Sequence, residues 1–489
     1  GLVEPLDRSA RTTSDIRDYL VTEMFSSLAE PDLQFMKETS ILSHLEAGFC
    51  DYVTQDNSGQ ERLEQLASSN LLILPLDQAA DRFRYHHLLQ AELGSLLEHD
   101  ESPEEVASLH RRAKEWTSSR GEVSEAIHHA MQAGDVEDAV ELVAANWYEF
   151  IMTGRVRSAD RWISYFSDRD VQEHPRLVLA GAMISAFAGH AEAARVFAAA
   201  AEAASCEGEG FVGAASYEAS VAIMRAGIAA DGPVSALVDA RRAAELEPLD
   251  SPYRPLLAAM IGTFIYSTEV RDAEAYPLLL EGARAATGPP ETAAYALANL
   301  ALLHAWRNDA EAALSYARQA IQRIDETNVG GFLVYGLPYA IVARFDTRHG
   351  HAAERRRLLE NAERAERSAS NAAPFDSMVL RTAMAEAYVA LEEFTLARTY
   401  AERALSNLAP MTEGGLVATR LDNVIRLINR ADPNPEGRAD ATGPLLSPRE
   451  VQILSLLTTD ETLAGIGGRL YISRNTVKTH TARIYRKLG

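Results

Sequence analysis

Cysteine and long apolar runs are scarce in this sequence. Only Cys50 and Cys206 are present, too few and too far apart for a disulfide framework or a cysteine metal site, which fits a reducing environment. The longest strongly apolar run, residues 177–188, is too short to cross a bilayer, and the first residues lack the features of a signal peptide. We therefore expect a cytoplasmic protein that does not contact a membrane.

Aromatic residues are also few, at 7% of the chain, whereas alanine is frequent. Alanine has the best helix propensity and a small side chain, so this composition favours closely packed helices over sheets. A chain of 489 residues exceeds the usual size of one domain, and we expect three or four units. The first residue is glycine rather than methionine, which indicates a segment of a longer protein.

Sequence signatures of enzymes are absent. The chain has no G-x-S-x-G elbow, no H-E-x-x-H helix and no dinucleotide fingerprint, and its histidines have no further ligands at metal-site spacing. It also lacks a G-x-x-x-x-G-K-[ST] loop, so it cannot hold ATP phosphates by that device. We expect no enzyme activity, metal or cofactor in the chain itself; ATP or ADP would enter only through a domain upstream.

Charge is distributed unevenly along the chain. The formal charge of −23 argues against nucleic-acid binding by the molecule as a whole. Residues 445–489, however, hold seven Lys or Arg against three Asp or Glu, a charge of +4, which leaves −27 on the other 444 residues. A small basic module on an acidic body is typical of a nucleic-acid-binding domain attached to something else.

A short pattern recurs between residues 110 and 430. A Gly, Asn or acidic residue is followed five positions later by Ala; the pairs are Gly121/Ala126, Gly134/Ala139, Gly154/Ala159, Gly189/Ala194, Asp231/Ala236, Asn308/Ala313 and Glu392/Ala397. Such a pair fits a tight turn before a helix that a neighbouring helix approaches closely. A period near 40 residues indicates a tetratricopeptide-like solenoid of helix pairs, with an irregular helical bundle as the alternative.

The first 109 residues have a different pattern. Helical periodicity over 15–28, 35–42 and 61–69 is followed by two short apolar runs, 71–76 and 83–85, which predict a β-hairpin. Helices followed by a hairpin indicate a winged-helix-like arrangement.

Proline and glycine mark the boundary near the other end of the chain, where residues 431–444 predict a linker. The expected fold is therefore mainly α. It consists of a winged-helix-like region at 1–109, tetratricopeptide-like helical repeats at 110–430, the linker, and a helix-turn-helix domain at 445–489.

The last domain has the pattern of a helix-turn-helix. Ser447, Pro448 and Glu450 suit the start of a first helix, as N-cap, first helical residue and capping-box partner. We expect Val451, Leu454 and Leu457 to form the buried side of that helix, residues 462–470 to form a second helix, and Ser473 to cap a third. The third helix has an inner face of Val477, Thr481, Ile484 and Leu488, and its outer face carries cations and hydrogen-bond donors suited to a DNA groove.

The strings LSPRE at 446–450 and YISRNTVKTH at 471–480 resemble the LuxR-type helix-turn-helix. This resemblance covers about residues 446–489 and implies that the domain binds double-stranded promoter DNA. It implies that Lys478, Thr479 and Ala482 read bases. The other expected DNA-binding residues, several of them at phosphates, are Ser473, Arg474, Asn475, Thr476, Arg483, Arg486 and Lys487.

The second helix of this domain departs from the LuxR pattern. Gly465 and Gly467 replace the Glu and Ala of the family, and Gly468 follows; each glycine costs about 0.5–1 kcal/mol relative to Ala. The sequence also stops at Gly489, where the family continues into a dimerisation helix. Both departures predict a weakened DNA-binding head.

Several strings in the first 170 residues resemble large ATP-dependent LuxR-type regulators, the maltose-activator-like signal-transduction ATPases, in the region after their nucleotide-binding domain. They include FMKETSIL at 35–42, RYHHLL at 84–89, HRRA at 110–113 and AIHHA at 126–130. The resemblance implies a winged helix, a repeat superhelix that binds an inducer, and a DNA-binding head, here without the ATPase domain.

Two histidine pairs stand out within these strings. In related ATPases a winged-helix histidine contacts the nucleotide phosphate, so His86 or His87 is a candidate nucleotide sensor; the alternative, which we favour, is a partly buried structural pair. We interpret His128 and His129 as packing or surface residues.

These features predict a DNA-binding transcriptional regulator whose repeat body senses an inducer or a protein partner, with self-association as a further expectation. The alternative is an interaction scaffold, or the regulatory tail of an upstream ATPase or cyclase, with a weakened DNA-binding head. The sequence identifies neither the inducer, nor the operator, nor the oligomeric state.

Overall fold

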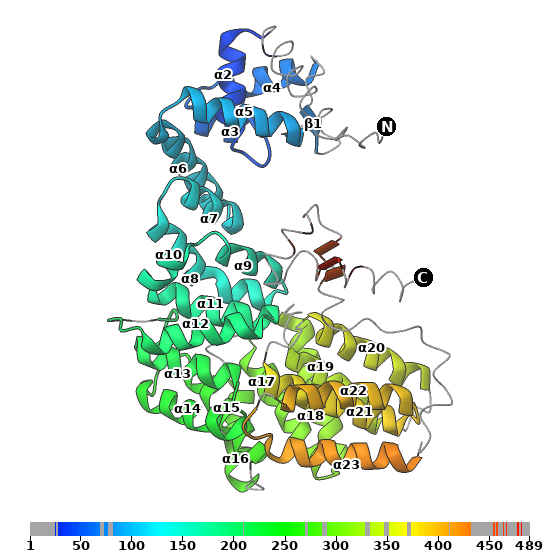
Figure 1. The fold of residues 1–489 in the computed structure, drawn as a ribbon. Coiled ribbons are helices and arrows are strands. Elements are labelled where there is room, and N and C mark those ends of the chain that lie inside the picture. The colour runs from blue at the N-terminus through cyan, green and yellow to red at the C-terminus, as the bar shows by residue number, and fades with distance from the viewer. Residues whose placement is uncertain are drawn as a thin grey trace, which may run out of the picture. The chain divides into compact units, whose positions relative to one another are not determined.

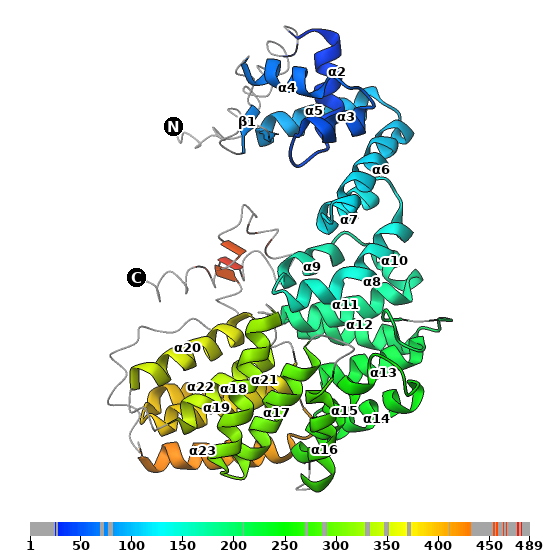
Figure 2. The same ribbon diagram turned by 180° about the vertical axis from the view of Figure 1, so that it is seen from behind.

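The computed structural model describes residues 25, 28–68, 73–76, 82–208, 210–268, 272–285, 291–327, 333–346, 352–368, 373–409 and 411–431, together with nine residues between 453 and 481. The chain divides into two compact units, residues 1–424 and 425–489. Figures 1 and 2 show the first unit as a succession of helix pairs that follows a small N-terminal domain.

The N-terminal domain combines helices and a hairpin as predicted, with two further helices, at 47–54 and 87–100, that were not predicted. Its elements are α2 (Glu30–Thr39), α3 (Ala47–Thr54), α4 (Gly59–Ser68), β1 (Ile73–Pro75), β2 (Phe83–Tyr85) and α5 (His87–Asp100). The strands pair antiparallel, with Ile73 opposite Tyr85, so the predicted hairpin is confirmed. The core of this domain includes Phe35, Met36 and Phe49, all nearly inaccessible to water.

Helix boundaries in this domain differ from the prediction, since the helix expected over 61–69 is α4 at Gly59–Ser68. The helix expected over 35–42 starts earlier, at Glu30, because Pro31 occupies its first turn, and it ends at Thr39. Beyond that end, the Ser40 hydroxyl donates to the Lys37 carbonyl at 2.7 Å. The helix expected over 15–28 lies outside the described residues, apart from Phe25 and Leu28.

The rest of the first unit is built of antiparallel helix pairs. Along the chain these are α6 (Pro103–Ser119) with α7 (Val123–Gln132), α8 (Val136–Met152) with α9 (Val156–Ile163), the short α10 (Asp168–Glu173), α11 (Pro175–Ala188) with α12 (Ala191–Ala203), α13 (Tyr217–Ile228) with α14 (Pro233–Leu246), α15 (Arg254–Thr268) with α16 (Asp272–Ala283), α17 (Thr292–Trp306) with α18 (Ala310–Thr327), the 3-10 turn η3 (Leu333–Tyr335), α19 (Gly336–Phe345) with α20 (Ala352–Ser368), α21 (Pro374–Ala390) with α22 (Phe394–Leu408), and α23 (Gly415–Ala431). The predicted mainly α fold with helical repeats is confirmed.

The recurring Gly/Ala pattern marks the turn inside or between these pairs. Gly121, Gly134, Gly154, Gly189, Asn308 and Glu392 all have positive φ, between 60° and 80°. At Gly189 the backbone closes two hydrogen bonds, Gly189 N–H to Ala186 O and His190 N–H to Ser185 O, which form a Schellman cap. Near Asp231 the left-handed residues are instead Ala229 and Gly232.

The alanine of each pair lies where two helices touch. Ala126, Ala139, Ala159, Ala313 and Ala397 are fully inaccessible to water, and Ala194 and Ala236 nearly so. A larger side chain at these positions would force the helices apart, since protein interiors have no spare volume. The predicted role of the pattern is therefore confirmed at all seven alanines.

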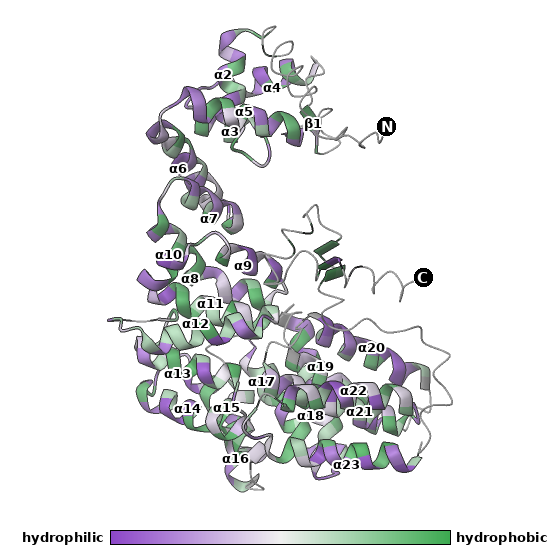
Figure 3. Cartoon of the chain, viewed as in Figure 1, coloured by the Kyte–Doolittle hydropathy of each residue, from purple (hydrophilic) through white to green (hydrophobic). Residues whose placement is uncertain are grey.

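In the pairs from α11 onward, the two helices differ in exposure. The first helix is enclosed by its neighbours; α17, for example, buries twelve of its fifteen residues, including Leu300 and Leu302. The second helix exposes one side, as in α20, which is strongly hydrophilic in Figure 3. This division explains why the first helices show little helical amphipathicity and the second ones carry the charge.

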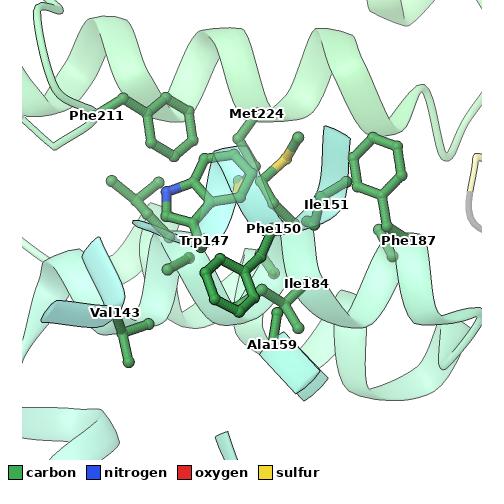
Figure 4. Packing of buried hydrophobic residues seen from close by; sticks show 14 of the residues in the cluster. Val143, Trp147, Phe150, Ile151, Ala159, Ile184, Phe187, Phe211 and Met224 are labelled. Atoms are coloured by element: carbon green, nitrogen blue, oxygen red, sulfur yellow. The ribbon is translucent and has the colours of Figure 1, made fainter. Parts of the chain in front are cut away.

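Aromatic side chains fill the core where α8, α9, α11 and α13 meet. Figure 4 shows Trp147 and Phe150 of α8 with Phe211 and Met224. The Trp147 and Phe211 rings are 5.3 Å apart, and Phe150 lies 4.4 Å from Trp162. Aromatic rings bury large apolar areas, so these contacts contribute strongly to a core that also contains aliphatic residues such as Ile151 and Ile184.

A charged network joins the N-terminal domain to the α6–α7 pair. Arg120 and Arg82 contact the Glu46 carboxylate at 3.2 and 3.7 Å. The Ser43 hydroxyl donates to Glu125 at 2.7 Å. Behind these residues the rings of Phe49 and Trp116 stack at 5.5 Å. The α6–α7 pair is thus bound to the N-terminal domain by both polar and aromatic contacts.

Three histidines meet inside this α6–α7 pair. The Nδ1 atoms of His110 and His129 are 2.9 Å apart, and the ring of His128 lies 5.4 Å from that of His129. His110 and His129 are 6% and 1% exposed. Of the two roles open to His128 and His129, His129 therefore has the packing role. Burial lowers the pKa of His110 to about 4 and that of His129 to about 3, so both imidazoles are neutral at pH 7.

We predict that acid weakens the fold through these two histidines. In the unfolded chain a histidine takes up a proton near pH 6.5, whereas in the folded chain it does so only near pH 4 or 3. Stability is therefore complete above pH 6.5 and falls below it. At pH 5.5 the loss in unfolding free energy is about 1.4 kcal/mol for each histidine.

Urea unfolding at pH 7.5 and 5.5, followed by tryptophan fluorescence, measures this loss. The variant His129→Gln removes one of the two buried imidazoles and should show a smaller loss between the two pH values. The variant His87→Gln, at an exposed position, should behave like the wild type. Equal losses in His129→Gln and the wild type would contradict the prediction.

Candidate functional site

The C-terminal unit has a small apolar core at the predicted helix-turn-helix. Ile453, Ile466 and Val477 are fully inaccessible to water and pack together, with Leu454, Leu456, Leu457 and Leu463 around them. Leu454 and Leu457 thus lie beside the core, as expected, whereas the fully buried residue of that segment is Ile453. Ile453 directly precedes Leu454 in the sequence, and the helical spacing alone did not show which of the two would be fully buried.

The described residues of the third predicted helix lie on the sides of the helix that the sequence predicts for them. Val477 is buried, and the Thr481 hydroxyl donates to the Val477 carbonyl at 2.9 Å, a contact of one helical turn. Lys478, next to Val477, is exposed. An ammonium group beside a buried anchor is available to a phosphate or a base edge.

The other expected DNA-binding residues lie outside the described residues: Ser473, Arg474, Asn475, Thr476, Thr479, Ala482, Arg483, Arg486 and Lys487. Their roles stay predictions from the resemblance. The same holds for the three glycines of the second helix.

The candidate nucleotide-sensing histidines lie at the start of α5. His86 is half-buried and caps the helix, since its Nδ1 atom accepts the Leu88 N–H at 3.4 Å. The His87 ring is exposed and lies 4.3 Å from that of His86. Capping gives His86 a structural role that the sequence had left open. The sensing role of the pair stays a prediction.

The repeat body has a groove of about 840 Å³ between α16 and α18, a size that suits a small ligand. Its polar wall includes Arg284, Tyr316, Gln319, Gln322 and Arg323. No sequence pattern pointed to this groove, because its residues come from different helix pairs.

Aromatic contacts hold one wall of the groove in place. The Tyr316 ring stacks on His304 at 5.4 Å, and its hydroxyl lies 2.8 Å from that of Tyr276. Burial, followed by the contact with Tyr276, raises the pKa of Tyr316 to about 12. On the other side His304 Nδ1 lies 2.9 Å from the Asp309 carboxylate. Tyr316 is therefore a neutral, fixed hydrogen-bonding group beside the groove.

Among the described residues, no three His, Cys, Asp or Glu side chains are grouped so that they could hold a metal ion. Within the same part of the chain, no helix combines the length and the apolar character needed to span a membrane.

Comparison with known proteins identifies both ends of the chain. The family described as "MalT winged helix domain" matches residues 21–106, and the family "Bacterial regulatory proteins, luxR family" matches residues 444–489. These matches confirm the winged helix and the LuxR-type helix-turn-helix expected from the sequence.

Individual relatives agree with these families. The HTH-type transcriptional regulator MalT of Klebsiella pneumoniae (strain 342) is 28% identical over 166 residues, and that of Cronobacter sakazakii is 27% identical over the same length. Each alignment covers 34% of this chain and 18% of the relative, so the match spans less than a fifth of the relatives' length.

A solved structure also aligns with this chain. It is a Signal Transduction ATPase with Numerous Domains (STAND) protein with a tetratricopeptide repeat sensor, from Pyrococcus horikoshii. The alignment covers 99% of this chain and 66% of that protein, at 15% identity and a TM-score of 0.47. The chain thus has an N-terminal domain similar to the MalT winged helix and a C-terminal domain similar to that of the luxR family.

Proposed function

We propose that this chain is a DNA-binding transcriptional regulator, in which the LuxR-family domain binds promoter DNA and the helical repeats sense an inducer or a protein partner. The match of residues 444–489 to the LuxR family carries the proposal. The exposed Lys478 beside the buried Val477 supports it, because this is the orientation that a recognition helix needs. The charge of +4 on residues 445–489 supports it further.

An interaction scaffold, or the regulatory tail of an upstream ATPase or cyclase, is the second candidate. Gly465, Gly467 and Gly468 favour it, because glycines in a helix lower its stability and would weaken a DNA-binding head. The two candidates differ in one measurable property, the preference for a particular DNA sequence.

We predict that Lys478→Ala weakens binding to the cognate promoter by about 1–3 kcal/mol and reduces the preference for it over random DNA, since a base contact is lost. Fluorescence anisotropy with the region upstream of the flanking genes, competed by random DNA, measures both effects. Arg241→Ala, an exposed arginine on α14, serves as the control and should bind like the wild type. If the wild-type chain, with its C-terminal domain folded, shows no preference for any promoter fragment, the scaffold is the better description.

Arg483→Ala should act differently from Lys478→Ala. A phosphate contact adds affinity without sequence preference, so its loss weakens binding to all DNA alike. The slope of log K against log salt concentration should become shallower by about 1. A titration from low to physiological salt measures this slope, and an unchanged slope would contradict the phosphate contact.

The groove between α16 and α18 supports the sensing part of the proposal. Its size, its polar wall and the fixed Tyr316 fit a small ligand with several hydrogen-bonding groups. We predict that a metabolite which raises the melting temperature of the wild type has no such effect on a variant with Arg284→Ala and Gln319→Ala.

The melting-temperature measurement with candidate metabolites needs a control variant in which the same residue types are substituted. Arg241→Ala with Gln132→Ala removes an exposed arginine and an exposed glutamine away from the groove, and should keep the response. A ligand that shifts both double variants equally binds elsewhere, and would rule the groove out as its site.

A further inference from the structure

The segment between α22 and α23 is hydrogen-bonded to the turn before α14, almost 180 residues earlier. Thr412 donates to the Asp231 carbonyl through its N–H at 3.2 Å and through its hydroxyl at 2.9 Å. Glu413 Oε1 accepts the Val234 N–H at 2.7 Å. We call Asp231, Gly232, Val234, Thr412 and Glu413 the α14–α23 latch.

Two glycines allow the chain segments to approach this closely. Gly232 has a φ of 112°, and a Cβ atom there would lie 2.1 Å from the Glu413 carbonyl oxygen. Gly415 has a φ of 57°, and a Cβ atom there would lie 2.3 Å from the Ser267 carbonyl oxygen of α15. Backbone meets backbone at both points, so no side chain larger than hydrogen fits.

The latch supplies the N-terminal cap of α14. The N-cap residue, Gly232, has no side chain to accept a hydrogen bond, and Pro233 has no N–H. The first free donor is the Val234 N–H, which the Glu413 carboxylate satisfies from across the fold. A carboxylate is favoured there because the N-terminus of a helix carries a partial positive charge. The start of α14 thus depends on a remote segment for a cap that is usually local.

The latch differs in character from the core around it. Thr412, Asp231 and Val234 are exposed, and hydrogen bonds join the two segments, although Gly232 and Pro233 between them are buried. Exposed polar contacts are worth little and open more easily than core contacts. A few residues further on, Arg420 holds α23 to the repeats, with its guanidinium 3.1 Å from Glu386 and over the Trp306 ring at 5.1 Å.

We propose that the α14–α23 latch opens as a unit, so that the first turn of α14 and the start of α23 become free together. Among the described helices, α23 is the one that precedes the LuxR-family domain in the sequence. An open or closed latch is therefore a state of the repeat body that the chain can pass on to the domain that follows. Only the transmission of the latch state to the LuxR-family domain rests on the proposed function. The opening of the latch does not.

Hydrogen exchange followed by mass spectrometry on the full chain tests the latch. Glu413→Ala removes the cap, and we expect exchange in residues 234–237 and 411–424 to become faster on the order of tenfold, the effect of losing one hydrogen bond to a charged group. Exchange in α6 and α7 should stay unchanged. Gly232→Ala should give the same result, because its Cβ atom collides with the Glu413 backbone.

Two controls separate the latch from general effects of substitution. Glu402→Ala removes an exposed carboxylate of α22. Gly213→Ala alters a glycine of positive φ, at 81°, where an added Cβ atom would lie 3.4 Å from Pro252, an ordinary contact distance. Both should leave residues 234–237 and 411–424 as in the wild type.

Two outcomes would overturn the proposal. If Glu413→Ala speeds exchange only in residues 234–237, Glu413 is a cap and α23 does not open with it. If exchange rises throughout the first unit, the contact is part of the global fold and no separate latch exists. No DNA enters the measurement, so a failure of DNA binding leaves its result unaffected.

Discussion

The left-handed residue that ends a helix, with the alanine five positions after it, is the constraint on which the repeat body depends. The positive φ turns the chain back within two residues, and the Schellman hydrogen bonds satisfy the carbonyls that the helix leaves open. The alanine then lets the next helix approach. Asn308 and Glu392 adopt the same conformation, which asparagine tolerates but which is unfavourable for glutamate, so at Glu392 the rest of the fold must hold the turn.

This local rule is also the part of the fold that the sequence predicts best. Gly189 and Ala194, or Asn308 and Ala313, can be recognised because turn and alanine are separated by a fixed number of residues. The β-hairpin is equally local. Contacts between segments that are far apart in the chain produce no such regular spacing in the sequence. Glu366, Arg381 and Asn407 form a buried cluster, with contacts of 2.8 and 2.6 Å, from three different helices, and their spacing in the sequence follows no period.

The candidate sites also differ in how far the sequence predicts them, and local spacing again decides the difference. Lys478 could be placed on the outer side of its helix because Val477 and Thr481 mark the inner side, and helical spacing settles the rest. The groove beside Tyr316 and the contact of Glu413 with α14 could not be foreseen, since each joins residues of separate helix pairs. His86 lies between these cases. Its position after the second strand of the hairpin could be predicted, whereas the helix α5 that follows, and the capping of that helix by the His86 ring, were not predicted.

Charge places a further condition on any function of the first unit. Its residues share most of the −27 that lies outside residues 445–489, and DNA carries its charge uniformly along both strands. The body therefore opposes the approach of all DNA alike, whatever the sequence, whereas the base contacts proposed for the C-terminal domain would act only at a matching site. Repulsion of this kind lowers occupancy of random DNA without reducing the ratio between cognate and random sites. If residues 445–489 bind DNA as proposed, their charge of +4 offsets part of this repulsion, and the selectivity depends on the base contacts.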